Sequence, residues 1–368
     1  MAVPQSQSSA RVQTDFLSAS DAARLVAQVG IVEVLRLMTE AVEADYGRWQ
    51  DFDKSARTAA HSASGVIELM PVADAHDYAF KYVNGHPANP RLGLPTVMAF
   101  GALAEVATGM PRFVSELTLT TALRTAATSA MAARRLARAG SRSMALIGNG
   151  SQSEFQALAF MALLGVNELR LFDIDPAAAQ KLVRNLQPWL PQFGATATVA
   201  ASVQQAVQGA DIVTTATADK TRATVLPEHL AEPGMHINAV GGDCPGKTEL
   251  EAGLLRRAQV FVEYEPQTRI EGELQQMPAD FAVTELWRVL QGLAPGRSSP
   301  QQITLFDSVG FALEDYSALR TMHALARRTG LLSQIELVPT LSDPKDLFAM
   351  VRSAQTGQVL GLHQRKTA

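Results

Sequence analysis

A glycine-rich turn set between an apolar strand and a helix constrains the fold of this chain most. The residues Leu-Ile-Gly-Asn-Gly-Ser-Gln-Ser at 146–153 follow the apolar run Met144–Ile147 and precede a helical pattern over Glu154–Leu164. Gly148 permits a tight turn, and Gly150 lets backbone amides approach a pyrophosphate at the helix N-terminus. The third position of the usual pattern is Ser153, so the packing of helix on strand must admit a hydroxymethyl group there. The turn predicts a dinucleotide-binding domain.

Apolar runs alternate with helical patterns on both sides of this turn, which is typical of βαβ units in a parallel sheet. We expect a Rossmann-type, doubly wound α/β domain with short connections. The predicted strands are Met144–Ile147, Leu169–Phe172, Thr196–Ala200, Asp211–Thr214, His236–Val240, Val260–Glu263 and Ile303–Phe306.

An acidic residue at the end of the second strand specifies the dinucleotide. Asp173 lies 25 residues after Gly148, where a carboxylate can bind the hydroxyls of the adenine ribose. Asp175 competes for this role, but its place before Pro176 suits the N-cap of the helix Pro176–Leu186 better. No arginine directly follows the acid, which favours NAD over NADP.

The two ends of the chain predict a second, α+β domain. Helical patterns cover Asp21–Arg48, Thr120–Ala139 and, near the end, Phe311–Arg328; short strands are expected at Ser64–Met70, Tyr78–Val83, Thr96–Phe100 and Ile335–Val338. The amphipathic helix near the end must bury its apolar face, and we place it against the N-terminal domain. Residues 1–128 together with 320–368 are predicted to form this second domain, and residues 129–319 the NAD-binding domain.

Composition excludes several classes of function. The net charge is −4 with no cluster of Lys and Arg, so no nucleic-acid surface is expected, and no apolar run is long enough to span a membrane. Cys244 is the only cysteine, and no histidine pair has metal-ligand spacing, so neither a disulfide nor a metal site is expected. Met1–Thr14 lacks the features of a signal peptide and is interpreted as a polar tail. A cytoplasmic enzyme is the simplest expectation.

Charged residues inside apolar runs are the candidates for a substrate site. Glu68 lies in Val-Ile-Glu-Leu-Met and Lys81 in Tyr-Ala-Phe-Lys-Tyr-Val, while Arg124 lies among small residues of a helix and Arg57 just before the first strand pair. Burying an unpaired charge costs several kcal/mol, so such residues need protein partners or a ligand.

Asp243 is a fifth candidate, because it follows a glycine pair just after a predicted strand of the Rossmann domain. Ligands bind in the crevice at this edge of doubly wound sheets. The alternative is a cap for a helix beginning near Thr248, although Pro245 and Gly246 intervene. Three cations could hold a carboxylate and two acids could meet two amines, so the set as a whole suits a diamino acid.

Four segments resemble the bacterial enzymes of the ornithine cyclodeaminase/μ-crystallin family. They are Phe80–Asn89, Ala145–Phe155, Asn238–Leu250 and Val262–Glu273, and the likeness runs in the same order from about Phe16 to Val351. Relatives in that family that reduce ketimines or dehydrogenate alanine typically lack an acid at the position of Asp243.

The resemblance implies that the domain of residues 1–128 and 320–368 binds substrate and builds a homodimer through its strands, and that NAD is tightly held and recycled. It implies a carboxylate clamp at Arg57, Lys81 and Arg124, with Glu68 and Asp243 as catalytic residues that contact the substrate amines. The implied cofactor contacts, which include the glycines of the turn, are Thr96, Arg124, Gly148, Gly150, Ser151, Gln152, Asp173, Thr217, Ala239, Val240, Gly241, Gly242, Lys247 and Ser308.

The activity implied by the resemblance is an ammonia-lyase reaction that converts L-ornithine to L-proline. The expected steps are hydride transfer to NAD, ring closure with Asp243 as base, loss of ammonia and return of the hydride. An L-lysine cyclodeaminase that forms L-pipecolate is an alternative, since one methylene is worth only about 1–3 kcal/mol in selectivity. Two further alternatives are an NAD(P)H-dependent ketimine reductase or amino acid dehydrogenase, and a nucleotide-binding protein of the crystallin type; Asp243 argues against both.

Overall fold

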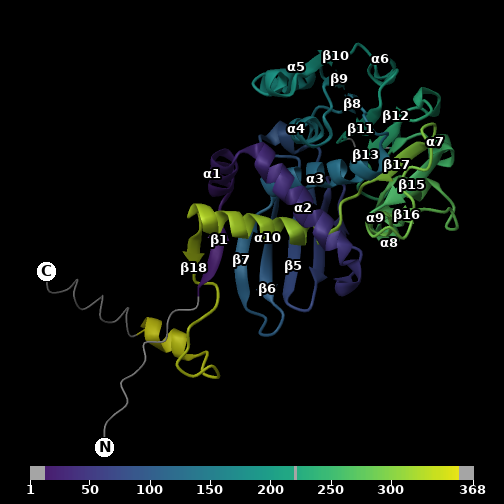
Figure 1. Ribbon diagram of the computed structural model, residues 1–368. Helices are drawn as coiled ribbons and strands as arrows, with labels where there is room; N and C mark the ends of the chain where they lie inside the picture. The colour runs from purple at the N-terminus through teal and green to yellow at the C-terminus, as the bar shows by residue number, and fades with distance from the viewer. Residues whose placement is uncertain (1–12, 219–221, 356–368) are drawn as a thin grey trace, which may run out of the picture.

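The computed structural model describes residues 13–218 and 222–355, and Figure 1 shows two sheets with helices packed around them. Of the predicted polar tail, residues 1–12 lie outside the described residues. The expected combination of a doubly wound α/β domain with an α+β region is confirmed.

The sheet formed by the middle of the chain is entirely parallel. Its strand order is β10-β9-β8-β11-β13-β17-β15-β16. The strands are β8 (Ser143–Ile147), β9 (Glu168–Phe172), β10 (Thr196–Val199), β11 (Ile212–Thr215), β13 (His236–Ala239), β15 (Ala258–Val262), β16 (Thr284–Glu285) and β17 (Ile303–Asp307). The helices of this region are α4 (Ser153–Leu164), α5 (Pro176–Leu186), α6 (Val203–Val207), α7 (Ala252–Arg257), α8 (Glu265–Glu271) and α9 (Leu286–Leu290).

The direction of winding reverses between β8 and β11. The chain moves outward through β9 and β10 and then returns to pair β11 with the other side of β8. At such a switch point the loops after adjacent strands diverge, and this leaves a crevice at the carboxyl edge of the sheet. The glycine-rich turn follows β8 and therefore lies at this crevice.

The two ends of the chain form a second sheet, which holds the first strand of the chain and is called the first sheet below. It is mostly antiparallel, in the order β18-β1-β7-β6-β5-β4-β2, with β3 also paired to β4. Its strands are β1 (Thr14–Leu17), β2 (Asp53–Lys54), β3 (Thr58–His61), β4 (Val66–Ala73), β5 (Asp77–Gly85), β6 (Ala99–Glu105), β7 (Pro111–Glu116) and β18 (Ser333–Ile335). The helices α1 (Ala19–Val29), α2 (Ile31–Gly47), α3 (Thr118–Leu136) and α10 (Ala312–Thr329) accompany it. In Figure 1, α10 crosses one face of this sheet, and it contacts β4, β5 and β6.

The C-terminal part of the chain, from α10 onward, therefore returns to the N-terminal region, as predicted. Leu313, Leu319 and Met322 of α10 are fully buried in a core shared with α2 and α3. The helix ends at Gly330, and β18 then pairs with β1. The predicted domain boundaries at 128/129 and 319/320 fall inside α3 and α10, so the structure shows no break there and the division stays a prediction.

Several elements differ from the sequence-based expectation. The strand expected at Thr96–Phe100 begins at Ala99, and the last strand lies at Ser333–Ile335 instead of Ile335–Val338. The alternative of a helix beginning near Thr248 is wrong. Residues 248–250 form β14 (Thr248–Leu250), which pairs with β12 (Arg222–Leu226), and the helix α7 begins only at Ala252. These short strands are held by main-chain bonds to distant partners, which local side-chain patterns do not encode.

Of the helices in the described ranges, none combines the length and hydropathy needed to cross a bilayer.

His236 in β13 generates a prediction about acid stability. The ring is fully buried, with Nδ1 3.0 Å from the Thr304 hydroxyl, and burial together with the Arg297 guanidinium lowers the pKa of His236 to about 3. The unfolded chain takes up a proton at His236 below about pH 6.5, whereas the folded protein does not until about pH 3. This group therefore lowers the free energy of unfolding as the pH falls below 6.5, by up to about 1.4 kcal/mol per pH unit.

We expect His236→Asn to make the free energy of unfolding less dependent on pH between 7 and 5, measured by urea denaturation. His76→Asn changes an exposed histidine and is the control, with the wild-type pH dependence expected. An unchanged pH dependence in His236→Asn would contradict the assignment.

Candidate active site

A cavity of about 230 Å³ lies where the first sheet meets the crevice of the parallel sheet. Residues of β4, β5 and α3 line it on one side, and the loops after β8, β11, β13 and β17 line it on the other. Both regions of the chain thus contribute to one site.

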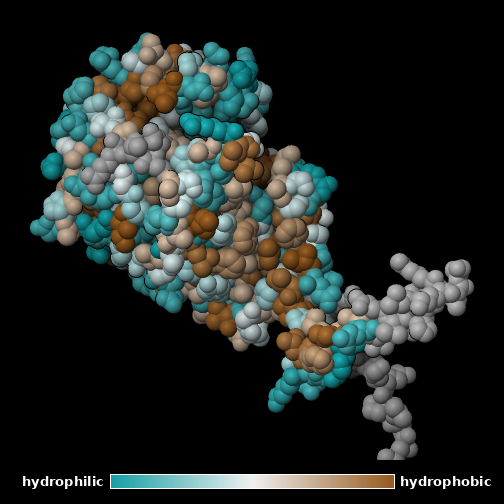
Figure 2. Space-filling model, turned by 180° about the vertical axis from the view of Figure 1, so that it is seen from behind, coloured by the Kyte–Doolittle hydropathy of each residue, from teal (hydrophilic) through white to brown (hydrophobic). Residues whose placement is uncertain are grey.

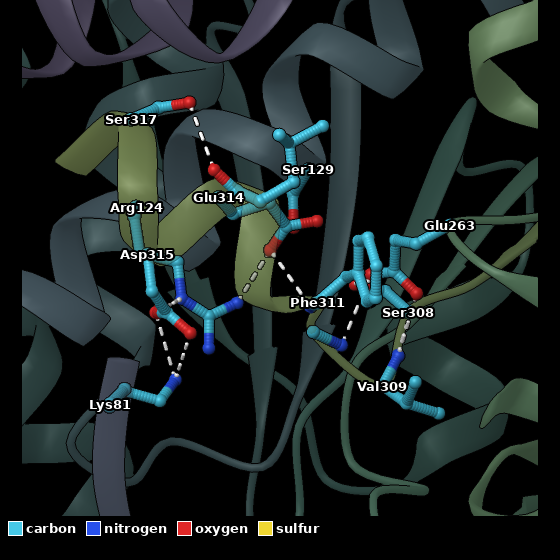
Figure 3. A network of polar contacts seen from close by, with 12 residues as sticks. Lys81, Arg124, Ser129, Glu263, Ser308, Val309, Phe311, Glu314, Asp315 and Ser317 are labelled. Atoms are coloured by element: carbon cyan, nitrogen blue, oxygen red, sulfur yellow. Dashed lines mark hydrogen bonds and ion pairs between the residues drawn. The ribbon is translucent and has the colours of Figure 1, made fainter. Parts of the chain in front are cut away.

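Two cations of the cavity are neutralised by α10. Lys81 Nζ lies 2.8 Å from the carboxylate of Asp315, which also lies 3.1 Å from Arg124 Nε; Arg124 Nη1 donates to Glu314 at 2.7 Å. Figure 3 shows the two cations converging on the start of α10. Lys81 and Glu68 share this inner face because Lys81 is opposite Met70, two residues from Glu68 on β4.

Pairing leaves donors to spare on these two cations. Arg124 Nη2 has no protein partner in the described part of the chain, and Lys81 uses its ammonium on a single carboxylate. Burial and the neighbouring Arg124 lower the pKa of Lys81 to about 8, although Asp315 acts in the opposite direction. A ligand carboxylate that binds here would favour the charged form of Lys81.

Arg57 differs, because protein acceptors take up nearly all of its N–H groups. Its Nη1 donates to Glu68 at 3.0 Å, its Nε lies 2.9 Å from Glu271, and its Nη2 donates to the carbonyls of Val309 and Gly310, each at 2.6 Å. Burial disfavours its charge, but Glu68 and Glu271 outweigh this and raise its pKa. Three of its five N–H groups donate hydrogen bonds to protein acceptors and a fourth, on Nε, faces Glu271 without a hydrogen bond among the described residues, so in this state Arg57 chiefly holds protein groups.

Glu68 presents a free oxygen to the cavity. The side chain is 6% exposed, and while Oε2 accepts from Arg57, Oε1 is buried without a hydrogen-bond partner. An unsatisfied buried acceptor costs about 1–3 kcal/mol, which an ammonium of a ligand could offset. Behind it, burial raises the pKa of Glu271 to about 7, with Glu68 and Asp243 adding to the effect against Arg57.

Asp243 lies across the cavity on the loop after β13 and is half exposed, at 51% of its side chain. Its carboxylate lies 3.2 Å from Lys247 Nζ, which also donates to the carbonyl of Thr217 at 2.9 Å. Asp243 can therefore both reach a ligand in the cavity and exchange protons with solvent.

The residues at the crevice fit a dinucleotide. Gly148 has φ +91°, and a Cβ there would lie 2.6 Å from the carbonyl oxygen of Ala216, so only glycine suits this turn. A Cβ at Gly150 would meet open space, and Gly150 lines the cavity. The first amides of α4 have no side-chain cap, and Gln152 Oε1 is buried without a partner. Uncapped amides at a helix N-terminus suit a phosphate.

Asp173 holds the turn itself. Its carboxylate accepts from the amide of Asn149 at 2.6 Å and from that of Asp175 at 2.8 Å, while Asp175 caps α5 through the amide of Ala177, as expected. Asp173 is not among the residues that line the cavity. Its predicted contact with an adenine ribose stays a prediction.

The structure brings most of the predicted site residues together. Those that line the cavity are Arg57, Glu68, Lys81, Thr96, Arg124, Gly150, Ser151, Gln152, Thr217, Val240, Gly241, Asp243, Lys247 and Ser308. Gly148, Asp173, Ala239 and Gly242 do not line it. Within residues 13–218 and 222–355, no group of three or more His, Cys, Asp or Glu side chains could hold a metal ion.

Sequence reasoning missed the acids that partner the cations. Glu314 and Asp315 lie in the first turn of α10, where acids are common because they suit the helix dipole, so nothing marked them as site residues. Glu271, the partner of Arg57, falls within the segment Val262–Glu273 that carried the family resemblance, as does Glu263, which accepts from the Ser308 hydroxyl and from the amides of Val309 and Gly310. That segment contained a usable signal, but its acids could not be assigned partners.

Known proteins match this chain over nearly its whole length. The profile of the "Ornithine cyclodeaminase/mu-crystallin family" matches residues 20–330. An ornithine cyclodeaminase of Brucella suis biovar 1 (strain 1330) is 56% identical over 336 residues, covering 91% of this chain and 93% of the relative.

Solved structures share the same fold. A lysine cyclodeaminase structure, described by its recognition of L-lysine, L-ornithine and L-2,4-diamino butyric acid, has a TM-score of 0.86 at 32% identity and covers 92% of this chain and 99% of its own. An archaeal alanine dehydrogenase dimer with bound NAD has a TM-score of 0.80 at 30% identity, covering 89% and 100%.

Proposed function

The chain belongs to the ornithine cyclodeaminase/mu-crystallin family, and we propose that it is an NAD-dependent ornithine cyclodeaminase, which converts L-ornithine to L-proline and ammonia. One observation carries the proposal: Glu68 and Asp243 line the same cavity as Lys81 and Arg124. A substrate with one carboxylate and two amines is the ligand whose charges this set complements.

NAD is supported by the turn after β8 and by the NAD-bound relative at 30% identity. The residues that would hold it include Gly150, Ser151 and Gln152 on the turn and Thr217 and Gly241 on the neighbouring loops. When bound, NAD supplies the reversible oxidation of the substrate α-carbon and is therefore recycled within each turnover.

The protein's own groups orient and deprotonate the substrate. Arg124 and Lys81 use their spare donors to hold the α-carboxylate, and Glu68 Oε1 accepts from the α-amine. Asp243 takes a proton from the δ-ammonium, so that the free δ-amine can bond to the α-carbon while the α-nitrogen leaves as ammonia. Because ring closure is intramolecular, holding the chain folded in the cavity supplies much of the rate acceleration.

The alternatives receive less support. The lysine cyclodeaminase structure is 32% identical to this chain, against 56% for the Brucella ornithine cyclodeaminase. A dehydrogenase or reductase would not need the acid at Asp243. The expectation of a cytoplasmic enzyme stays a prediction.

We also propose that the chain forms a homodimer through the uncovered face of the first sheet. Figure 2, which views the molecule from behind, shows apolar side chains gathered on this side. Ile67, Leu69, Tyr78 and Phe100 are between 39% and 46% exposed, and the rings of Phe100 and Tyr82 stack at 5.0 Å. A contiguous apolar patch of this kind is typical of an interface, and one of the related structures is a dimer.

The reaction predicts ammonia and proline without net formation of NADH. With L-ornithine in large excess over NAD, we expect many equivalents of both products and no growing NADH absorbance. L-lysine run in parallel should turn over more slowly. NADH accumulating in step with product would support a dehydrogenase instead, and faster turnover of lysine would reassign the substrate.

Asp243→Ala is expected to lower kcat by about 10²–10⁴-fold, because the general base is lost, while NAD affinity stays close to that of the wild type. Ammonia release and NAD titration measure the two effects. Glu40→Ala is the matched control, since Glu40 is also half exposed and paired with a cation four residues away. Wild-type turnover in Asp243→Ala would remove Asp243 from the mechanism.

Phe100→Asp is expected to shift the protein from dimer to monomer, because a carboxylate would be buried in an apolar interface. Light scattering coupled to size exclusion measures the mass against 39.4 kDa for one chain. Val199→Asp alters a residue that is similarly exposed, at 50%, on the edge strand β10 of the other sheet and should leave the mass unchanged. A monomeric wild type, or a dimeric Phe100→Asp, would count against this interface.

A further inference from the structure

Three buried carboxylates follow one another beneath the carboxyl edge of the parallel sheet. Asp307, at the end of β17, accepts from the amides of Glu273 and Leu274, each at 3.0 Å. Glu273 in turn accepts from the amides of Glu249 and Leu250 at 2.7 and 3.1 Å. Asp307 thus holds the backbone of Glu273, and Glu273 holds the backbone of Glu249.

Glu249 is the end of this series and faces the cavity loops. Its Oε1 accepts from the amide of Thr217 at 2.6 Å and from the Thr217 hydroxyl, and its Oε2 accepts from the amide of Gly241 at 3.1 Å. Thr217 follows β11 and Gly241 follows β13, which are neighbouring strands. Glu249 therefore ties together two loops that both line the cavity.

The glycine pair after β13 is explained by these acids. A Cβ at Gly241 would lie 2.1 Å from Glu249 Oε1, and one at Gly242 would lie 2.7 Å from Glu273 Oε1. Both carboxylates are buried and fixed by backbone amides, so they could not move aside. The two glycines admit the carboxylates to the backbone; a close approach of the cofactor is not needed to account for them.

Burying the Glu249 carboxylate costs free energy, which indicates that the side chain has a function that offsets this cost. A carboxylate that is 1% exposed loses its hydration and must recover it from hydrogen bonds. Thr217 is also held from its carbonyl side by Lys247 at 2.9 Å. Glu249 thus holds the amide of Thr217 and Lys247 holds its carbonyl, so two buried charged side chains fix this residue at the cavity.

We propose that Glu249 is a positioning residue that sets the loops at Thr217 and Gly241 to the spacing that NAD binding requires. Glu249 is not among the residues that line the cavity, and it acts through the amides it holds. This inference rests on the proposed use of NAD.

Glu249→Gln tests the proposal. Glutamine has nearly the same size, but its side-chain NH2 group replaces one carboxylate oxygen and cannot accept a hydrogen bond from a backbone amide. We expect the Kd for NAD, measured by calorimetric titration, to rise at least about tenfold. At saturating NAD, the KM for L-ornithine should change less than the Kd for NAD, because Lys81 and Arg124, which hold the substrate carboxylate, are paired with α10 and not with Glu249.

Asp211→Asn is the matched control. Asp211 accepts from the amides of Arg142 and Ser143 at 2.8 and 3.0 Å, so it ties the same sheet at its amino edge, away from the cavity. Both variants should lower the melting temperature, but Asp211→Asn should keep the wild-type Kd for NAD. If Glu249→Gln does not fold, Glu249→Asp keeps the charge but is too short to reach both loops, and the same comparison applies.

The outcomes distinguish the proposed use of NAD from the positioning role of Glu249. A wild-type protein that does not bind NAD would overturn the proposed function itself. Wild-type NAD affinity in Glu249→Gln, or an equal loss of affinity in Asp211→Asn, would overturn the positioning role while leaving that function in place.

Discussion

The pairing of Lys81 and Arg124 with the first turn of α10 is the interaction on which the architecture of this enzyme depends. Both cations are at least nine-tenths buried and could not remain charged there without Asp315 and Glu314. These acids belong to the helix that follows the last central strand of the parallel sheet, so the same helix that packs the tail onto the first sheet also completes the site. Figure 3 shows Lys81 and Arg124 meeting Asp315 and Glu314 at the start of this helix.

This electrostatic arrangement also shapes what the site can bind. Lys81 and Arg124 are neutralised but keep spare donors, whereas Arg57 is committed to Glu68, Glu271 and two carbonyls. Under the proposed function, a substrate carboxylate would therefore meet Lys81 and Arg124 rather than all three of the expected cations. Glu68 and Asp243 remain for the amines, one buried with a free oxygen and one half exposed. That asymmetry suits one amine that must be oriented and another that must lose a proton.

The central strands of the parallel sheet, such as β8, β11 and β17, were predictable because they are buried on both faces and read as apolar runs, whereas the two-residue edge strand β16 was missed. The first sheet was less predictable. The short strands β1 and β18 were missed or displaced because main-chain partners far away in the sequence hold them, and the six-residue interior strand β7 was missed as well. Among site residues, Glu68 and Lys81 could be found because a charge stands out in an apolar strand. Glu314 and Asp315 could not, because acids at a helix start are unremarkable.

The sequence by itself determined that a glycine turn follows a buried strand, that Lys81 and Glu68 are charges inside apolar strands, and that Asp243 lies at the carboxyl edge. Each of these follows from local patterns and spacing. Only the tertiary structure decided that Lys81 pairs with Asp315, 234 residues away, that Arg57 donates to Glu68 and to two carbonyls, and that Gly241 and Gly242 make room for Glu249 and Glu273. The physical reason is that a buried charge requires a partner, but the partner's identity is set by which distant segments pack together.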